Sequence, residues 1–254
     1  GGEMSGMAAF TRKELVENVR TYRMFLMLAL FFFFGVSSPL LAKFTPLLIE
    51  TFAVNMEVTV KEPGAADAWM QFYKNVSSLG LSLMIILFSS SLSGEYAKGT
   101  LTIMFTKGLS RRAVVLSKFT SSAVIMTVSY WLSFAVAWAY TAYLWPGEGF
   151  KHLLLSAFVV WLTALLYLCI LMLGCVMFRQ AFTAILFLLV FTVVMGLLSM
   201  TPLLEGVSPS FLVMKNVDLL TGEAAASQFI LPGILTVILS AVLLLLSVMV
   251  FDRK

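Results

Sequence analysis

The stretch 152–178 reads HLLLSAFVVWLTALLYLCILMLGCVMF and contains no Lys, Arg, Asp or Glu. An α-helix rises about 1.5 Å per residue, so this stretch is long enough to cross the roughly 30 Å hydrocarbon core of a bilayer. A helix also satisfies its own backbone hydrogen bonds in lipid, and the alternation typical of a β-barrel strand is missing. The stretch therefore predicts a transmembrane helix.

Charge-poor stretches of this kind recur along the chain, which is 60% hydrophobic and only 12% charged. Such a composition leaves too little polar surface for a water-soluble globule. We therefore expect an all-α integral membrane protein with a single transmembrane domain over 7–254 and with residues 1–6 left over from cloning. The predicted spans are 24–48, 74–93, 113–144, 152–178, 182–201 and 228–250.

Two cysteines, Cys169 and Cys175, fall inside one predicted span. Buried cysteines behave mainly as small apolar residues, and these two lie too far apart along a helix for an easy bridge. We expect neither a disulfide nor a metal site.

The basic residues set the predicted orientation, because cytoplasmic segments carry an excess of Lys and Arg. With six spans, twelve of the seventeen Lys and Arg residues fall on the side of both termini and five on the other. Both termini should be cytoplasmic, in the plasma membrane of a bacterium or archaeon. The net charge of +4 is thus a topology signal, and no nucleic-acid partner is expected.

Residues 8–22 precede the first span and predict an amphipathic helix lying on the membrane surface. Its apolar side would carry Leu15, Val19 and Tyr22, and its polar side would carry Lys13, Glu14, Glu17 and Arg20. The alternative is an ordinary solvated helix that leads into the membrane.

The predicted cytoplasmic loop 94–112 has Gly94, Gly99 and Gly108 as breakers around a short apolar piece. A short helix held by turns, with charges at its ends, suits docking against a soluble partner. A mere connector is the alternative, although the segment is unusually apolar for one.

This loop carries a recognisable pattern. Glu95, Gly99-Thr100-Leu101, Ser110-Arg111 and Lys118 resemble the E-x-x-x-G-T-L, S-R and K pattern of ABC-2-type transporter permeases, and residues 10–15 resemble that family's interfacial helix. Lys107-Gly108 departs from the pattern, since many relatives have a proline-containing turn there.

The resemblance implies the fold of the ABCG-like exporters, a second copy of the permease, and two ABC ATPase subunits that bind ATP and Mg²⁺. The chain itself has no G-x-x-x-x-G-K-[ST] loop and is expected to hold no cofactor. The family implies that the ATPase contacts the interfacial helix and the first cytoplasmic loop. The implied coupling residues are Lys13, Glu14, Glu95, Gly99, Thr100, Arg111 and Arg112. Glu95 would pair with a basic group or helix end, or alternatively cap the local backbone.

A polar stripe on the second span suggests a translocation path. Asn75, Ser78, Ser82, Ser89 and Ser93 fall within about 60° of one another on a helix, and Thr192, Gly196 and Ser199 form a weaker stripe on the fifth span. Hydroxyls without charges suit an amphipathic or apolar cargo. The alternative is that small residues simply allow close helix packing.

The predicted outer segments are 49–73, expected to be solvated, and 202–227. The second contains a candidate re-entrant or interfacial element at 211–214, or else is an ordinary exposed loop. Together these features favour an ATP-driven exporter permease. A stand-alone channel or ion-coupled carrier, for example for sodium efflux, is the first alternative, although ionisable groups are missing from the centres of the spans. A membrane enzyme is disfavoured because no span end gathers catalytic groups.

Overall fold

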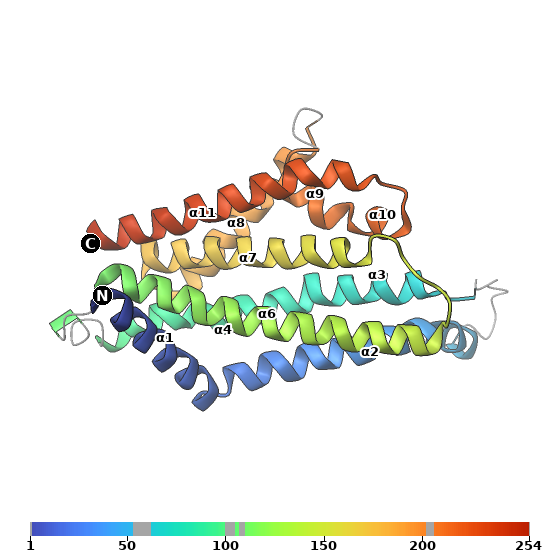
Figure 1. Cartoon of the computed structure of the whole chain (residues 1–254), viewed down its shortest axis with the longest axis horizontal. Coiled ribbons are helices and arrows are strands. Elements are labelled where there is room, and N and C mark those ends of the chain that lie inside the picture. Colours follow the sequence, from blue (N-terminus) through green and yellow to red (C-terminus); the bar gives the residue numbers. More distant parts are fainter. Residues whose placement is uncertain (1, 53–61, 100–104, 107–109, 202–205, 254) are drawn as a thin grey trace.

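The computed structural model describes residues 2–52, 62–99, 105–106, 110–201 and 206–253. Every regular element within these ranges is helical, and six helices are long and apolar enough to cross a membrane (Figure 1). They are Arg23–Leu47, Ala65–Tyr96, Arg111–Leu144, Leu153–Phe178, Ala181–Ser199 and Ala226–Arg253. The prediction of an all-α membrane protein with six spans is confirmed.

The helices follow one another as a bundle with both chain ends at the same end (Figure 1). The elements are α1 (Gly2–Arg20), α2 (Arg23–Phe52), α3 (Ala65–Asn75), a π-helical turn (Val76–Gly80), α4 (Leu81–Lys98), α6 (Arg111–Leu144), α7 (Leu153–Phe178), α8 (Ala181–Ser199), α9 (Pro209–Met214), α10 (Asn216–Thr221), a 3-10 turn (Ala226–Phe229) and α11 (Ile230–Arg253).

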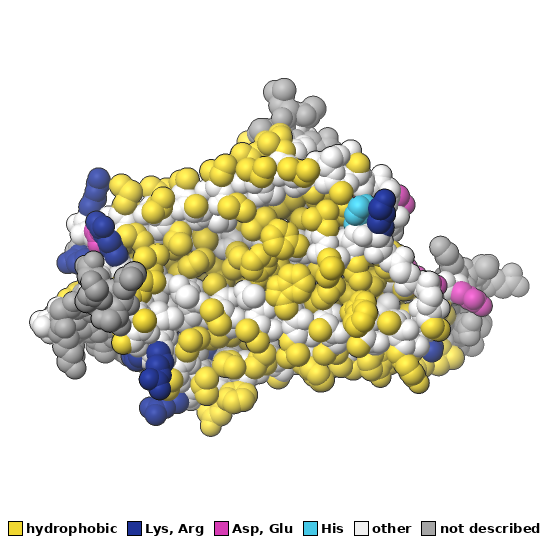
Figure 2. Space-filling model, in the orientation of Figure 1, with side chains coloured by type: hydrophobic (Ala, Val, Ile, Leu, Met, Phe, Trp, Pro, Cys, Tyr) yellow, Lys and Arg dark blue, Asp and Glu magenta, His cyan; other side chains and the backbone are white. Residues whose placement is uncertain are grey.

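Lysine and arginine side chains gather at the end that holds both termini, which we call the basic end (Figure 2). The opposite end carries the connection between α6 and α7 and the short helices α9 and α10 (Figure 1). This separation matches the charge pattern from which the orientation was predicted.

Helix α7 forms the centre of the bundle. In its most apolar window 83% of the residues are buried, against 11% for α8. Both helices are apolar throughout, so hydropathy does not separate them. The exposed apolar surface of α8 must face lipid or another protein.

Helices α2 and α6 approach very closely. A Cβ added at Gly35 would lie 2.7 Å from the carbonyl oxygen of Ser133. The Ser133 hydroxyl donates a hydrogen bond to the carbonyl of Phe31. Small residues let helix backbones meet in lipid, so this contact fixes the spacing of two spans.

The second span is longer than predicted, because its helix begins at Ala65 rather than near residue 74. Residues 65–73 therefore do not belong to a solvated loop, as the prediction for 49–73 had it. Asp67 and Lys74 make the segment look polar, but its other face is buried. That face consists of Ala65, Ala68, Trp69, Phe72 and Tyr73.

The loop predicted at 94–112 is also partly helical. Helix α4 continues to Lys98 and ends at Gly99, whose φ of +67° is the left-handed conformation that favours glycine. Helix α6 begins at Arg111, with the Ser110 hydroxyl accepting a hydrogen bond from the Ala113 amide at its N-terminus. Glu95 and both arginines thus lie on helices, while Thr100 lies outside the described residues.

Within 202–227, the described residues 206–227 contain the short helices α9 and α10. Leu212, Leu219 and Leu220 are buried against the bundle. The segment is therefore a packed helical cover over the end of α7, in line with the predicted short element at 211–214 and unlike an exposed loop.

Candidate coupling site and translocation path

Charged side chains meet inside the protein where α1 lies against α4 and α6, at the basic end. The Lys118 ammonium lies 2.9 Å from Glu14 Oε2 and 3.3 Å from Glu95 Oε1. Lys118 is 1% exposed, Glu14 2% and Glu95 7%. Lys118 therefore joins three helices through one buried group, and we call these three residues the buried ion cluster.

Lys13 and Glu17 extend this cluster to the surface. Lys13 Nζ lies 2.9 Å from Glu17 Oε2 and 3.3 Å from Glu14 Oε1. Burial opposes the charge on Lys13, but the hydrogen bond to Glu17 and the nearby carboxylates outweigh it and raise the lysine's pKa. Burial likewise opposes the charge on Glu17, and the hydrogen bond from Lys13 prevails and lowers the pKa of Glu17.

Three carboxylates, those of Glu14, Glu17 and Glu95, have oxygens within 4.8 Å of one another. Such a group could in principle hold a metal ion. The ammonium groups of Lys13 and Lys118 lie among these carboxylates and supply the compensating charge.

Further contacts hold α1 against α6. The Ser117 hydroxyl donates to the carbonyl of Met7 at 3.2 Å. Phe10 and Asn18 are buried on the same side of α1 as Glu14, one helical turn away in each direction. Glu14 therefore lies on the face of α1 that packs into the protein, and its predicted place on the polar side of a surface helix was wrong.

The two predicted coupling arginines contact the end of α11. Arg111 Nη1 donates to the carbonyl of Phe251 at 3.2 Å, and Arg112 Nε donates to Asp252 Oδ2 at 2.8 Å. Cations near a helix C-terminus are favoured by the helix dipole. The start of α6 and the end of α11 are therefore fastened together at the basic end.

The polar stripe of the second span divides into two parts. Ser78 and Ser82 are exposed and donate to carbonyls one turn back, whereas Ser89 and Ser93 are buried. The Cys175 thiol of α7 donates to the Ser89 carbonyl at 3.3 Å. The stripe reaches the surface only in the part far from the basic end, because α7 covers α4 nearer the basic end.

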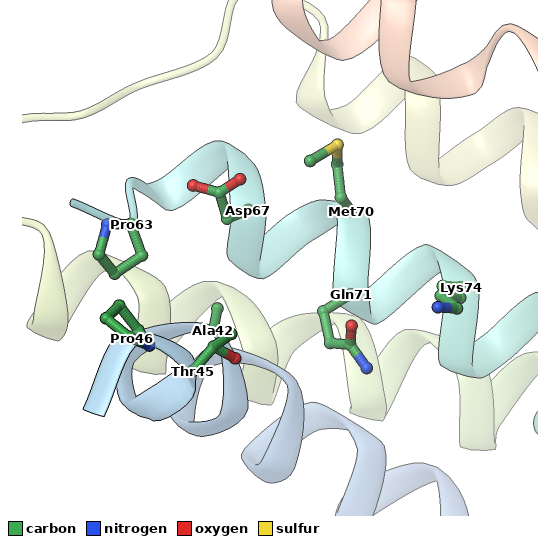
Figure 3. A pocket seen from close by; sticks show the side chains of 8 residues that line it. All are labelled: Ala42, Thr45, Pro46, Pro63, Asp67, Met70, Gln71 and Lys74. Carbon is green, nitrogen blue, oxygen red and sulfur yellow. The ribbon is translucent and has the colours of Figure 1, made fainter. Parts of the chain in front are cut away.

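Asn75 links the part of the stripe far from the basic end to α2. Its amide donates to Ser38 Oγ at 3.0 Å, and its carbonyl accepts from Gln71 at 3.2 Å. Gln71 in turn lines a pocket of about 470 Å³ between the ends of α2 and α3 that lie away from the basic end, shown in Figure 3. The pocket is lined by Ala42, Thr45, Pro46, Pro63, Asp67, Met70, Gln71 and Lys74.

The weaker stripe on α8 faces a different place. Thr192 lines a small cavity of about 20 Å³ together with Thr163 and Tyr167 of α7. Ser199 is buried and donates to the carbonyl of Gly196 at 2.6 Å. The α8 stripe thus packs toward α7 and α9, away from the pocket between α2 and α3.

A family model described as "ABC-2 family transporter protein" matches residues 8–254. The chain belongs to the ABC-2 transporter family. The match covers nearly all of the chain and confirms the resemblance drawn from residues 95–118. ABC-2 permeases are typically non-catalytic membrane subunits, and they generally pair with ABC ATPase subunits. Among curated proteins no match is found for this ABC-2 chain.

Sequence reasoning about this ABC-2 protein missed the pairing of Glu14 with Lys118. A usable signal was present, since Lys118 is a charge inside a predicted span and such a charge needs a partner. The spacing of Phe10, Glu14 and Asn18 at intervals of four residues places Glu14 on an inward-facing side of the helix.

Proposed function

We propose that this ABC-2 protein is the permease subunit of an ATP-driven exporter that moves an amphipathic or apolar cargo out of the cell. Two separate ATPase subunits bind ATP and Mg²⁺, and a second copy of the permease completes the transporter. In this arrangement the basic end faces the cytoplasm.

The buried ion cluster carries the proposal. The family resemblance assigns ATPase contact to helix α1 and to the end of α4 before residue 100. The cluster joins both of these elements to the start of α6. Such a group leaves few alternative arrangements, because any displacement that kept one charge buried without its partner would be costly. An ATPase that pushes on α1 or on the adjoining loop therefore moves α4 and α6 together as a rigid unit.

The cargo route follows the outer part of the second span. Ser78 and Ser82 present hydroxyls at the surface of the chain, and the polar pocket beside Gln71 and Lys74 lies further toward the opposite end. A second copy facing these residues would enclose a route lined by hydroxyls and amides, with charges only at its outer mouth. Ser89, Ser93 and the α8 stripe would join the route only after helix movement, since they now face inward.

The test is affinity purification of the chain from its native membrane after mild detergent extraction, followed by mass spectrometry. We expect an ABC ATPase to copurify. Replacing residues 100–104 by a Gly-Ser linker of equal length should abolish its recovery without touching the described helices.

The matched control replaces residues 202–205, which lie between α8 and α9 in the sequence, by the same kind of linker and should retain the ATPase. A homogeneous complex without any ATPase from both the native chain and the control would refute the exporter proposal in favour of a channel or carrier.

The route is tested by single cysteine substitutions at Ser78 and Ser82, with Leu79→Cys as the exposed apolar comparison. We expect the two serine positions to react with a water-soluble thiol reagent and Leu79→Cys to remain unlabelled in lipid. Protection of both serine positions in every nucleotide state would exclude this helix face from the route.

A further inference from the structure

We propose that a groove between α1, α2 and α6 binds an anionic phospholipid, with an acyl chain between the helices and the phosphate at Arg20. The groove has a volume of about 450 Å³, within the range of roughly 300–1,000 Å³ that holds whole small ligands. Its lining consists of Leu15, Val16, Val19, Arg20, Met24, Leu28, Val124, Ile125 and Val128.

The groove is apolar except at one point. Eight of its nine lining residues are aliphatic or methionine, and Arg20 is the ninth. Val16 and Val128 are 43% and 50% exposed, so the groove is open to the surroundings. An apolar surface in a membrane protein with a single cation at its rim matches a molecule with a long hydrocarbon chain and an anionic head.

The position of the groove fits the depth of a lipid. The chain turns from α1 into the spanning helix α2 at Thr21 and Tyr22, and Tyr22 is 69% exposed with a φ of 59°. Tyrosine side chains favour the headgroup level of a bilayer. The groove starts beside this corner and continues along α2 and α6, so an acyl chain there would run alongside the membrane helices.

The charge at the rim is available for a headgroup. Within the described part of the chain Arg20 forms no ion pair, and the nearby Glu17 is paired with Lys13 at 2.9 Å. Arg23, the next arginine, donates instead to Ser90 at 3.0 Å. Figure 2 shows basic side chains gathered near this corner, which would also attract an anionic headgroup.

This site is independent of the transport proposal. It would stabilise the angle between α1 and α2, and through Glu14 it would support the buried ion cluster. The lipid is therefore expected to have a structural role and to stabilise the position of α1 against α2 and α6.

The test is native mass spectrometry of the purified full chain released from nanodiscs of equal phosphatidylglycerol and phosphatidylcholine. We expect retained phosphatidylglycerol on the native chain. Arg20→Gln should lower this retention about fivefold, the loss associated with one basic contact to an anionic headgroup, and leave phosphatidylcholine unchanged. Arg12→Gln, an exposed arginine of α1 outside the groove lining, is the matched control.

A second variant separates the groove from general surface charge. Val128→Trp fills the groove and should reduce retention of both lipids, whereas Val190→Trp on the exposed side of α8 should not. Equal retention by Arg20→Gln and Arg12→Gln would overturn the proposal. The proposal would also be overturned if the Val128→Trp chain kept its lipid but no longer associated with a second copy of the chain, because the groove would then be a protein interface.

Discussion

Lys118 joins two buried carboxylates in the interior of the bundle. Its ammonium is almost completely buried and lies between two carboxylates from different helices. The attraction within such a group roughly offsets the cost of removing its members from water, so its presence adds little net stability. Removing Lys118 alone is costly, because the two buried carboxylates then lose the cation that lies closest to both of them.

We therefore expect Lys118→Met to destabilise the chain by roughly 3–5 kcal/mol. The reason is that Glu14 and Glu95 would lose their buried cation and keep only the half-exposed Lys13, which lies 3.3 Å from Glu14 Oε1 and 3.9 Å from Glu95 Oε1. Thermal unfolding of the detergent-purified protein, followed by circular dichroism, measures the effect.

The triple variant Lys118→Met, Glu14→Gln and Glu95→Gln should recover most of that stability, because no buried charge remains. Lys43→Met, at an exposed lysine of α2, is the control and should change stability by less than about 0.5 kcal/mol. A triple variant as unstable as the single one would show that Lys118 acts through packing rather than charge.

Helix spacing depends on a few small residues. The close approach of α2 and α6 at Gly35 leaves no room for a methyl group, since the contacted atom is a backbone carbonyl oxygen 2.7 Å away. Gly35→Ala should cost about 1–3 kcal/mol by forcing the two helices apart.

The matched control for this substitution is Gly233→Ala in α11, where an added Cβ meets nothing within 4 Å. There the gain in helix propensity, up to about 1 kcal/mol, should stabilise the chain. Chemical unfolding in mixed micelles measures both. Equal effects at the two glycines would contradict the close α2–α6 contact.

The start of α3 is held by a residue distant in sequence. Glu148, in the connection after α6, accepts a hydrogen bond from the Ala65 amide at 2.8 Å, and Trp145 donates to the Pro63 carbonyl at 2.8 Å. A carboxylate at a helix N-terminus satisfies an amide and complements the helix dipole. Part of the cap of the helix at 65–73 comes from residue 148, which no local sequence pattern shows, and the local Asp67 contact alone was not recognised as a helix start.

Glu148→Gln should therefore loosen the first turn of α3, at a cost of roughly 0.5–2 kcal/mol. Hydrogen exchange of the amides at 65–68 should rise, while exchange in α7 stays unchanged. Glu223→Gln, an exposed carboxylate near the same end, is the comparison. Unaltered exchange at 65–68 would mean that Asp67, which accepts from the Gly64 amide at 2.9 Å, holds the turn alone.

At the scale of the whole molecule, the number of spans could be predicted from the sequence, because a bilayer requires every spanning stretch to be long and apolar. Each apolar stretch must be helical and about 20 residues long, whatever its neighbours are. The buried ion cluster could not be predicted in the same way, because Glu14 and Lys118 are brought together only by the packing of α1 on α6. Whether the serines of the second span face a route or the core likewise depends on which helix covers them.

The orientation of the whole bundle follows from its charge and can be tested directly. Single cysteines replacing Gly149 and Glu223 at one end, and Arg12 and Arg253 at the basic end, occupy exposed positions. Both native cysteines are buried and should react little. With the basic end in the cytoplasm, a membrane-impermeant maleimide should label positions 149 and 223 in intact cells. Positions 12 and 253 should label only after the membrane is opened, and the reverse pattern would place the proposed ATPase contacts on the wrong side of the membrane.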